Sequence, residues 1–192
     1  MADLKVCTTS AKFYVVQLVL PNCAVRSWHP DDLGSLVANA DNHNIWLNLR
    51  DRFPHPYTRR AGREFIRQAM SQRPETMFAI AVNDEAVGGI GFTVLTDVER
   101  VSAEIGYWLG EPFWGKGLVT EALVAVTRYA IETCRLTRIY ALPFAYNTAS
   151  CRVLEKAGYT LEARLRRSAI KDGRVVDQLQ YSFIAEGPEG RL

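Results

Sequence analysis

The sequence predicts one domain of mixed α/β class, with helices packed on a single mixed sheet. Strand-like apolar runs and segments with a helical 3.6-residue period alternate along the chain, and no linker separates them. A glycine-rich loop, Trp114 to Thr120, joins one strand to the longest helix. Because 192 residues can bury a substantial core, we predict a single domain over 1–192.

The first half of the chain is predicted to hold two strands and then amphipathic helices. Phe13–Leu20 and Ala24–Trp28 have the length and apolar content of strands, and Pro21 and Asn22 favour a turn between them. A helix is expected to start at His29-Pro30-Asp31. The other elements of this half are a short helix at Ile45–Leu47, a loop with two prolines at Arg50–Tyr57, and a helix capped by Thr58.

The second half begins with a predicted antiparallel meander of strands at Met77–Val82, Ala86–Leu95 and Val101–Leu109. The helix Thr120–Cys134 follows the glycine-rich loop and has one apolar face. The inward residues of that face are Leu123, Val126, Ala130 and Ile131. The remaining elements are a strand at Arg138–Leu142, a helix at Thr148–Ala157 closed by Gly158, and a hairpin of Thr160–Ala169 and Val175–Ala185 that turns at Asp172-Gly173.

The composition excludes several classes of protein. With 48% hydrophobic residues, 23% charged residues and a net charge of +2, the chain lacks the basic bias of a nucleic-acid-binding protein. No run approaches the roughly 18 apolar residues that span a bilayer, and the N-terminus lacks the long apolar region of a signal peptide. We therefore expect a cytoplasmic protein with no membrane partner. The four cysteines are scattered without metal-site spacing, so we expect free thiols and no bound metal: Cys7, Cys23, Cys134 and Cys151.

The strongest functional signal is the segment from Glu104 to Thr120, in which an apolar strand leads through a turn into the glycine-rich loop. Free backbone N–H groups at a helix start and the positive end of the helix dipole favour an anion there. Gly110 to Lys116 fits the first seven positions of a Walker A loop, but Gly117 stands where a magnesium-binding Ser or Thr is needed. The G-x-G-x-x-G fingerprint of dinucleotide-binding loops is also absent, because Gly115-Lys116-Gly117 is followed by Leu118, Val119 and Thr120. The loop is therefore predicted to hold a diphosphate without a metal.

Three ordered segments then carry a family resemblance. They are Glu104-Ile-Gly-Tyr-Trp-Leu, Trp114-Gly-Lys-Gly-Leu-Val-Thr-Glu-Ala and Asn147-Thr-Ala-Ser-Cys-Arg-Val-Leu-Glu-Lys-Ala-Gly-Tyr. Over roughly residues 17–185 the chain resembles the GNAT acetyltransferase superfamily, and more narrowly its ribosomal-protein N-terminal acetyltransferase branch of RimJ and RimL type. Three positions depart from the superfamily pattern: Trp114 replaces Gln or Arg, Val119 replaces Gly or Ala, and Leu154 replaces a tyrosine that often acts as the acid.

The resemblance implies acetyl-CoA as co-substrate. Backbone N–H groups from Gly115 through Thr120 would bind its diphosphate, and backbone at Trp108 and Leu109 would pair with the pantetheine arm. That pairing requires a gap in the sheet, which such families make by splaying two parallel strands with a bulge. A strand N–H near Tyr107 would polarise the thioester carbonyl. The implied cofactor-binding residues are Tyr107, Trp108, Leu109, Trp114, Gly115, Lys116, Gly117, Leu118, Val119, Thr120 and Asn147.

Two residues are predicted to be catalytic. A carboxylate on an apolar strand is costly unless it faces water or a partner, so Glu104 is the candidate general base, with a structural rim carboxylate as the alternative. The resemblance places Ser150 near the thioester sulfur, as an acid or as a hydrogen-bond donor to sulfur; the alternative is an ordinary serine of the first helical turn. For Asn147 a helix-capping role can coexist with binding the pantetheine arm.

The resemblance predicts an N-acetyltransferase that acts on a protein or peptide α-amino group by direct attack in a ternary complex. A polyamine, amino acid or aminoglycoside acceptor, or a non-catalytic acyl-CoA sensor, remains an alternative. Homodimers occur in this branch, and the sequence leaves the oligomeric state open. Two groups have both a functional and a structural interpretation. The first group either lines the acceptor mouth or packs in the core, and consists of Trp46, Phe53, His55 and Tyr57. The second group either attracts an anion or forms a solvated face of the hairpin, and consists of Arg164, Arg166, Arg167, Lys171 and Arg174.

Overall fold

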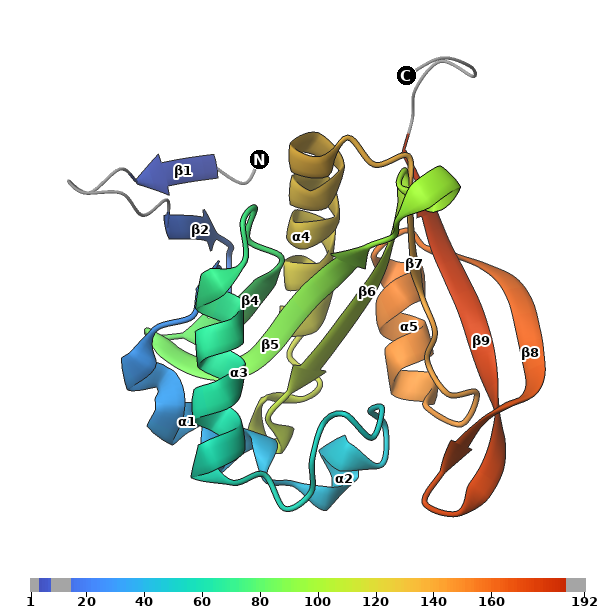
Figure 1. Ribbon diagram of the computed structural model, residues 1–192, viewed down its shortest axis with the longest axis horizontal. Helices are drawn as coiled ribbons and strands as arrows, with labels where there is room; N and C mark the ends of the chain where they lie inside the picture. The colour runs from blue at the N-terminus through green and yellow to red at the C-terminus, as the bar shows by residue number, and fades with distance from the viewer. Residues whose placement is uncertain (1–3, 8–14, 186–192) are drawn as a thin grey trace.

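The computed structural model describes residues 4–7 and 15–185, and within them it places nine strands in one mixed sheet (Figure 1). The strand order is β1-β2-β3-β4-β5-β6-β7-β9-β8. All neighbouring strands are antiparallel except β6 and β7, which are parallel. The strands are β1 Leu4–Cys7, β2 Val15–Val19, β3 Ala24–Ser27, β4 Met77–Val82, β5 Glu85–Val94, β6 Ser102–Leu109, β7 Arg138–Ala141, β8 Thr160–Lys171 and β9 Arg174–Ile184.

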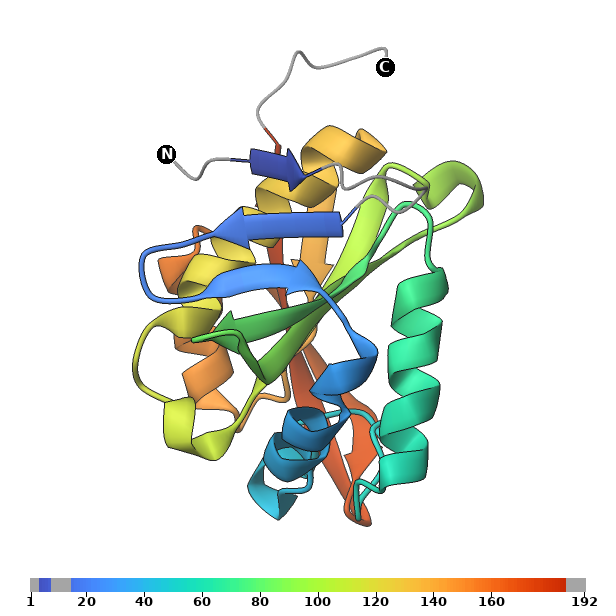
Figure 2. The same cartoon turned by 90° about the vertical axis from the view of Figure 1, so that its left-hand side faces the viewer.

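Helices cover both faces of this sheet, and Figure 2 shows α3 and α4 on opposite sides of it. Apolar side chains alternate along the strands, so each face has its own buried cluster. On β4, Phe78 and Ile80 belong to the cluster under α4, whereas Ala79 belongs to the cluster under α1 and α3. The helices are α1 Leu33–Ala40, α2 His43–Trp46, α3 Arg59–Ser71, α4 Leu118–Cys134 and α5 Thr148–Lys156.

Most of the predicted elements are confirmed, and the differences have local causes. The strand β1 was not predicted, and residues 13–14 of the first expected strand lie outside the described residues. The helix α4 begins at Leu118, two residues before the expected Thr120, because Gly117 in the left-handed conformation is its N-cap. Thr58 caps α3 as predicted: its hydroxyl accepts a hydrogen bond from the Ala61 N–H at 3.2 Å.

The predicted gap in the sheet lies between β6 and β7. These two strands pair over three positions, from Ser102–Arg138 to Glu104–Tyr140, and then diverge. On its other side, β6 pairs with β5 from Ala103 to Leu109, and the register there does not shift. The predicted splay is therefore confirmed, but the bulge expected in it is absent from this register. The C-terminal half of β6 is left with backbone groups that face the gap.

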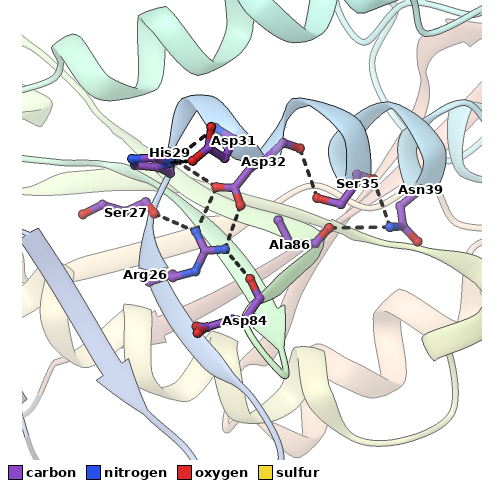
Figure 3. Close-up of polar contacts among 9 residues, drawn as sticks. All are labelled: Arg26, Ser27, His29, Asp31, Asp32, Ser35, Asn39, Asp84 and Ala86. Carbon is purple, nitrogen blue, oxygen red and sulfur yellow. Dashed lines mark hydrogen bonds and ion pairs between the residues drawn. The ribbon is translucent and has the colours of Figure 1, made fainter.

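A buried ion pair fixes the segment before α1 to strand β3 of the sheet (Figure 3). Arg26 on β3 donates to both carboxylate oxygens of Asp32, at 2.8 and 2.7 Å. The same guanidinium donates to the Asp84 carbonyl oxygen at 2.7 Å, and Asp32 also accepts from the His29 N–H at 2.8 Å. This cluster therefore joins β3, the turn between β4 and β5, and the segment that leads into α1.

Candidate functional site

A cavity of about 400 Å³ lies beside the open half of β6. Its walls come from the end of β6, the glycine-rich loop with the first turn of α4, the first turns of α5, and α2 with the residues after it. The structure thus brings together all of the residues that the sequence proposed as cofactor-binding, and Ser150 with them. These lining residues are Tyr107, Trp108, Leu109, Trp114, Gly115, Lys116, Gly117, Leu118, Val119, Thr120, Asn147 and Ser150.

The glycine-rich loop is held in a conformation that favours glycine. Gly115 and Gly117 have φ values of +75° and +79°, a region that costs other residues strain. A Cβ at either position would meet no atom within 4 Å, so backbone conformation rather than crowding explains the two glycines. No side chain caps α4 at its N-cap Gly117, so the N–H groups of the first turn, which belong to residues that line the cavity, are left without a side-chain partner. Such an arrangement can bind an anion.

Trp114 fixes the start of this loop to the strand. Its half-exposed indole donates from Nε1 to the Leu109 carbonyl oxygen at 2.7 Å, across the turn between β6 and α4. Next in the loop, the exposed Lys116 holds Nζ 5.2 Å from the centre of the Phe113 ring. The tryptophan therefore has a structural role at the position where the superfamily pattern has Gln or Arg.

Ser150 and Tyr107 meet across the gap between β6 and α5. The Ser150 Oγ lies 2.8 Å from the Tyr107 hydroxyl oxygen, and that hydroxyl also lies 3.2 Å from the Ser150 carbonyl oxygen. Burial raises the pKa of Tyr107, so this phenol stays protonated at neutral pH. Asn147 is the N-cap of α5, where its Oδ1 accepts a hydrogen bond from the Ser150 N–H at 3.1 Å. Asn147 therefore orients the helical turn that carries Ser150.

Glu104 lies outside this cavity. It precedes Tyr107 by three positions on β6, and side chains at odd separations point to opposite faces of a strand. Its carboxylate forms an ion pair with Arg50 from the loop after α2, and its side chain is 24% exposed. Glu104 is thus on the face of β6 opposite Tyr107, whose hydroxyl contacts Ser150.

Sequence reasoning missed two parts of the cavity wall. One is formed by Asn44 and Ile45 of α2 with Asn48 and Leu49 after it, a region that the sequence had assigned to the acceptor side and not to the cofactor cavity. The other is a pair of exposed cations on α5, Arg152 and Lys156. Their i, i+4 spacing places both on one helix face, and this spacing after Asn147 was the available signal. The packing partner of α2 depends on the fold, so no sequence signal placed this helix beside the cofactor cavity.

The basic residues of the hairpin are not in the cavity wall. Arg164 donates to Asp177 on the neighbouring strand at 2.7 Å. Lys171 is buried: its ammonium lies 3.7 Å from the centre of the Trp46 ring and 2.8 Å from Asp51 Oδ1. The interpretation of the hairpin cations as a solvated face is therefore wrong for Lys171, which joins the hairpin to α2 and the loop after it. A cation–π contact and an ion pair together compensate for its burial.

The aromatic residues expected near the acceptor mouth divide into two groups. Tyr57 is buried, and Phe53 packs between it and Trp108 with ring centres 4.8 and 5.8 Å away. Packing explains these two residues. Trp46 and His55 instead form a cluster with His43, outside that core, with ring centres 5.3 to 5.7 Å apart.

Two further features bear on the class of site. Among residues 4–7 and 15–185 no group of three or more His, Cys, Asp or Glu side chains is placed to hold a metal ion. In the same part of the chain, no helix combines the length and the apolar character needed to cross a membrane.

Comparisons of sequence agree on one family. The acetyltransferase (GNAT) domain family matches residues 23–160. The "Uncharacterized N-acetyltransferase p20" of Bacillus licheniformis is 36% identical over 109 residues, or 56% of this chain and 61% of that protein. The ribosomal-protein-serine acetyltransferase of Escherichia coli is 30% identical over 110 residues, or 57% of this chain and 61% of that protein. The matched segment thus spans less than two thirds of each of these two relatives.

Longer matches come with lower identity. The ribosomal protein uS5-alanine N-acetyltransferase of Escherichia coli is 27% identical over 173 residues, or 85% of this chain and 88% of that protein. The structure of Mycobacterium smegmatis RimJ in complex with CoA-disulfide has a TM-score of 0.75 at 26% identity, covering 89% of this chain and 87% of that one. RimL, a ribosomal L7/L12 alpha-N-protein acetyltransferase in complex with coenzyme A, has a TM-score of 0.76 at 21% identity, covering 86% and 96%. The likeness to RimL is one of fold.

Proposed function

This chain belongs to the GNAT acetyltransferase domain family, and from that premise we propose that it is an acetyl-CoA-dependent N-acetyltransferase whose acceptor is the N-terminal α-amino group of a protein or peptide. The observation that carries the proposal is the cavity, where a glycine-rich helix start, an unpaired strand edge and two paired hydroxyls meet. Relatives named for ribosomal-protein N-acetylation support the choice of acceptor.

The residues present fit the chemical parts of acetyl-CoA. The uncapped start of α4 with its two positive-φ glycines suits a diphosphate, and the exposed Lys116, Arg152 and Lys156 add positive charge to the same cavity. The backbone of Trp108 and Leu109 lies where β6 has lost its neighbour, which suits the amides of a pantetheine arm. When bound, acetyl-CoA supplies an acetyl group that is activated as a thioester.

Glu104 would serve as the general base from the other face of β6. An amine acceptor is protonated at neutral pH and must lose a proton before its nitrogen can attack. The Glu104 carboxylate is partly exposed and already pairs with a cation, the Arg50 guanidinium. An acceptor ammonium can take the place of Arg50, and its proton then passes to Glu104 directly or through water. Proton transfer of this kind contributes about 10²- to 10⁴-fold to a rate.

Ser150 and the backbone of β6 would act at the thioester end. The Ser150 hydroxyl can donate a hydrogen bond to the departing sulfur. A free thiol has a pKa of about 8.5, so a thiolate leaves readily and full protonation by a serine is unnecessary. Backbone N–H groups near Tyr107 can polarise the carbonyl oxygen.

The first test is calorimetric titration with acetyl-CoA, free coenzyme A and ATP–Mg²⁺, followed by a thiol-release assay with a pool of N-terminal peptides. We expect coenzyme binding, no binding of ATP–Mg²⁺, and thiol release with peptide acceptors. Release with polyamines, amino acids or aminoglycosides but not with peptides would contradict the proposed acceptor. Coenzyme binding without release for any amine would favour an acyl-CoA sensor. Failure to bind any coenzyme would overturn the whole proposal.

The role of Glu104 is tested by Glu104→Gln, with Glu132→Gln on the exposed face of α4 as the matched control. We expect Glu104→Gln to keep its affinity for coenzyme A and to lose about 10²- to 10⁴-fold in turnover near neutral pH. The control should retain both. Equal turnover of Glu104→Gln and wild type would remove Glu104 from the mechanism.

A further inference from the structure

The Tyr107 hydroxyl contacts two oxygens of one residue. It lies 2.8 Å from Ser150 Oγ and 3.2 Å from the Ser150 carbonyl oxygen, and both residues line the cavity. Tyr107 comes from β6 and Ser150 from the first turn of α5, so the contact spans the gap into which the pantetheine arm would enter. Both residues therefore border the site, while Tyr107 also packs against the apolar core.

The number of protons limits how this pair can be arranged. The Ser150 carbonyl oxygen can only accept, and each hydroxyl has one proton to donate. If Tyr107 donates to the carbonyl, the Ser150 hydroxyl is free to donate back to the Tyr107 oxygen. If Tyr107 donates to Ser150 Oγ, the serine proton cannot point at Tyr107 and is directed away from it, into the cavity or to a carbonyl oxygen of the preceding turn. The Tyr107 proton thus selects between these two directions of the Ser150 hydroxyl.

We propose that Tyr107 is a positioning residue, which donates to Ser150 Oγ and so directs the Ser150 proton at the sulfur of bound coenzyme A. This inference rests on the proposed function. In the transfer, the carbon–nitrogen bond forms as the carbon–sulfur bond breaks, and the electron pair of that bond stays on sulfur. The acceptor ammonium loses one proton to Glu104 before the attack and a second proton as the amide forms, and both protons pass to solvent by way of Glu104. Tyr107 and Ser150 keep their own protons throughout.

Full proton transfer from Tyr107 would be unfavourable. A phenol has a pKa of about 10, above the value of about 8.5 for a thiol. Burial raises the pKa of Tyr107 further, so a tyrosinate would not form to protonate a thiolate. A hydrogen bond donated to the charged form nevertheless stabilises that form. The role of Tyr107 is therefore to strengthen and aim the hydrogen bond from Ser150.

This role has a readout that requires no acceptor and no turnover. A hydrogen bond from Ser150 to the thiolate lowers the pKa of the thiol of bound coenzyme A. The ultraviolet absorbance of the thiolate reports that pKa in a pH titration, with desulfo-coenzyme A in the same protein as the blank. The variants are Tyr107→Phe, Ser150→Ala and their combination. Tyr159→Phe is the matched control, because its hydroxyl pairs with Thr127 at 2.6 Å in the buried core and not in the cavity.

In wild type and in Tyr159→Phe we expect a bound thiol pKa about one unit below the free value of about 8.5. Ser150→Ala should raise this pKa back to the free value. Tyr107→Phe should raise it by a large part of the same difference, and the double variant should match Ser150→Ala. An unchanged pKa in Tyr107→Phe, or additive effects of the two substitutions, would overturn the inference. Wild type that binds coenzyme A without a shift would overturn this inference alone, whereas wild type that does not bind would overturn the proposed function.

Discussion

Polar groups are arranged in opposite ways at the 3₁₀ turn Pro30–Asp32, which leads into α1, and at the start of α4. Before α1, the guanidinium of Arg26 and the carboxylate of Asp32 satisfy each other and the neighbouring backbone (Figure 3). Before α4, a left-handed glycine takes the N-cap position and no side chain caps the helix. The first arrangement is closed and holds the fold together. The second leaves donors open, and open donors in a concave site indicate a ligand.

The largest expected effect comes from opening the closed cluster. Arg26→Ala leaves the Asp32 carboxylate, whose side chain is 8% exposed, without its cation. Removing one partner of a buried ion pair costs about 3–5 kcal/mol of unfolding free energy. Urea denaturation should show this loss, while the coenzyme affinity of the folded protein stays within about twofold.

The matched control for Arg26→Ala is Arg60→Ala, which breaks the exposed i, i+4 pair with Glu64 on α3. An exposed pair of this kind contributes under about 0.5 kcal/mol, so the urea midpoint should barely move. Similar losses in the two variants would show that burial does not distinguish the two pairs. A large loss of coenzyme affinity in folded Arg26→Ala would show that the closed cluster also serves the cavity.

The next effect is a loss of coenzyme affinity when the glycine-rich loop before α4 is distorted. In Gly117→Ala the loop must regain a left-handed conformation that costs a non-glycine residue about 1–2 kcal/mol. We expect coenzyme affinity to fall roughly 5- to 30-fold by calorimetry. Gly173→Ala is the matched control, because Gly173 has φ of +71° and equally open surroundings but lies at the hairpin turn. It should lose stability and keep its affinity; equal losses of affinity would contradict a local role for the loop.

A smaller effect concerns the cations of the cavity wall. Arg152→Gln and Lys156→Gln should each weaken coenzyme binding about two- to fivefold at low ionic strength, because each removes one solvent-screened attraction to phosphate. The difference from wild type should shrink when titrations are repeated in about 0.5 M salt. Arg128→Gln, an exposed cation of α4 outside the cavity, is the control for net charge. Salt-independent losses would mean that these side chains act through packing.

The smallest effect is the pH dependence of the stability that a partly exposed ion pair contributes. Arg138 on β7 donates to Glu162 on β8 and lowers the pKa of that carboxyl to about 2. Because the unfolded value is about 4.3, this stabilisation is present above pH 4.3 and is lost as the pH falls towards 2. The Glu162 side chain is 35% exposed, so we expect under about 1 kcal/mol. Urea midpoints of wild type and Glu162→Gln should converge between pH 5 and 2; a constant difference would argue against the pair.

Local sequence patterns were enough to predict most of the helices and strands and the glycine-rich loop at the start of α4. Apolar periodicity located the strands and helices, because burial of one face is a local pattern that any fold must respect. The residues Trp114 to Thr120 indicated a ligand site because the two glycines and the start of the helix lie close together in the sequence. The end of β6 and the first turn of α5 could be assigned to the same site only through the family resemblance.

Tertiary structure alone decided which distant residues meet. Lys171 was interpreted together with the other hairpin cations as part of a solvated face. The fold instead places it in contact with Trp46 and Asp51, more than 100 residues earlier in the chain. Glu104 and Ser150 were predicted to be catalytic in separate roles, and the two-residue alternation of β6 places Glu104 on the face opposite Tyr107, whose hydroxyl contacts Ser150. Such contacts depend on strand register and on where two strands diverge. Both are properties of the assembled sheet, and no local stretch of sequence encodes them.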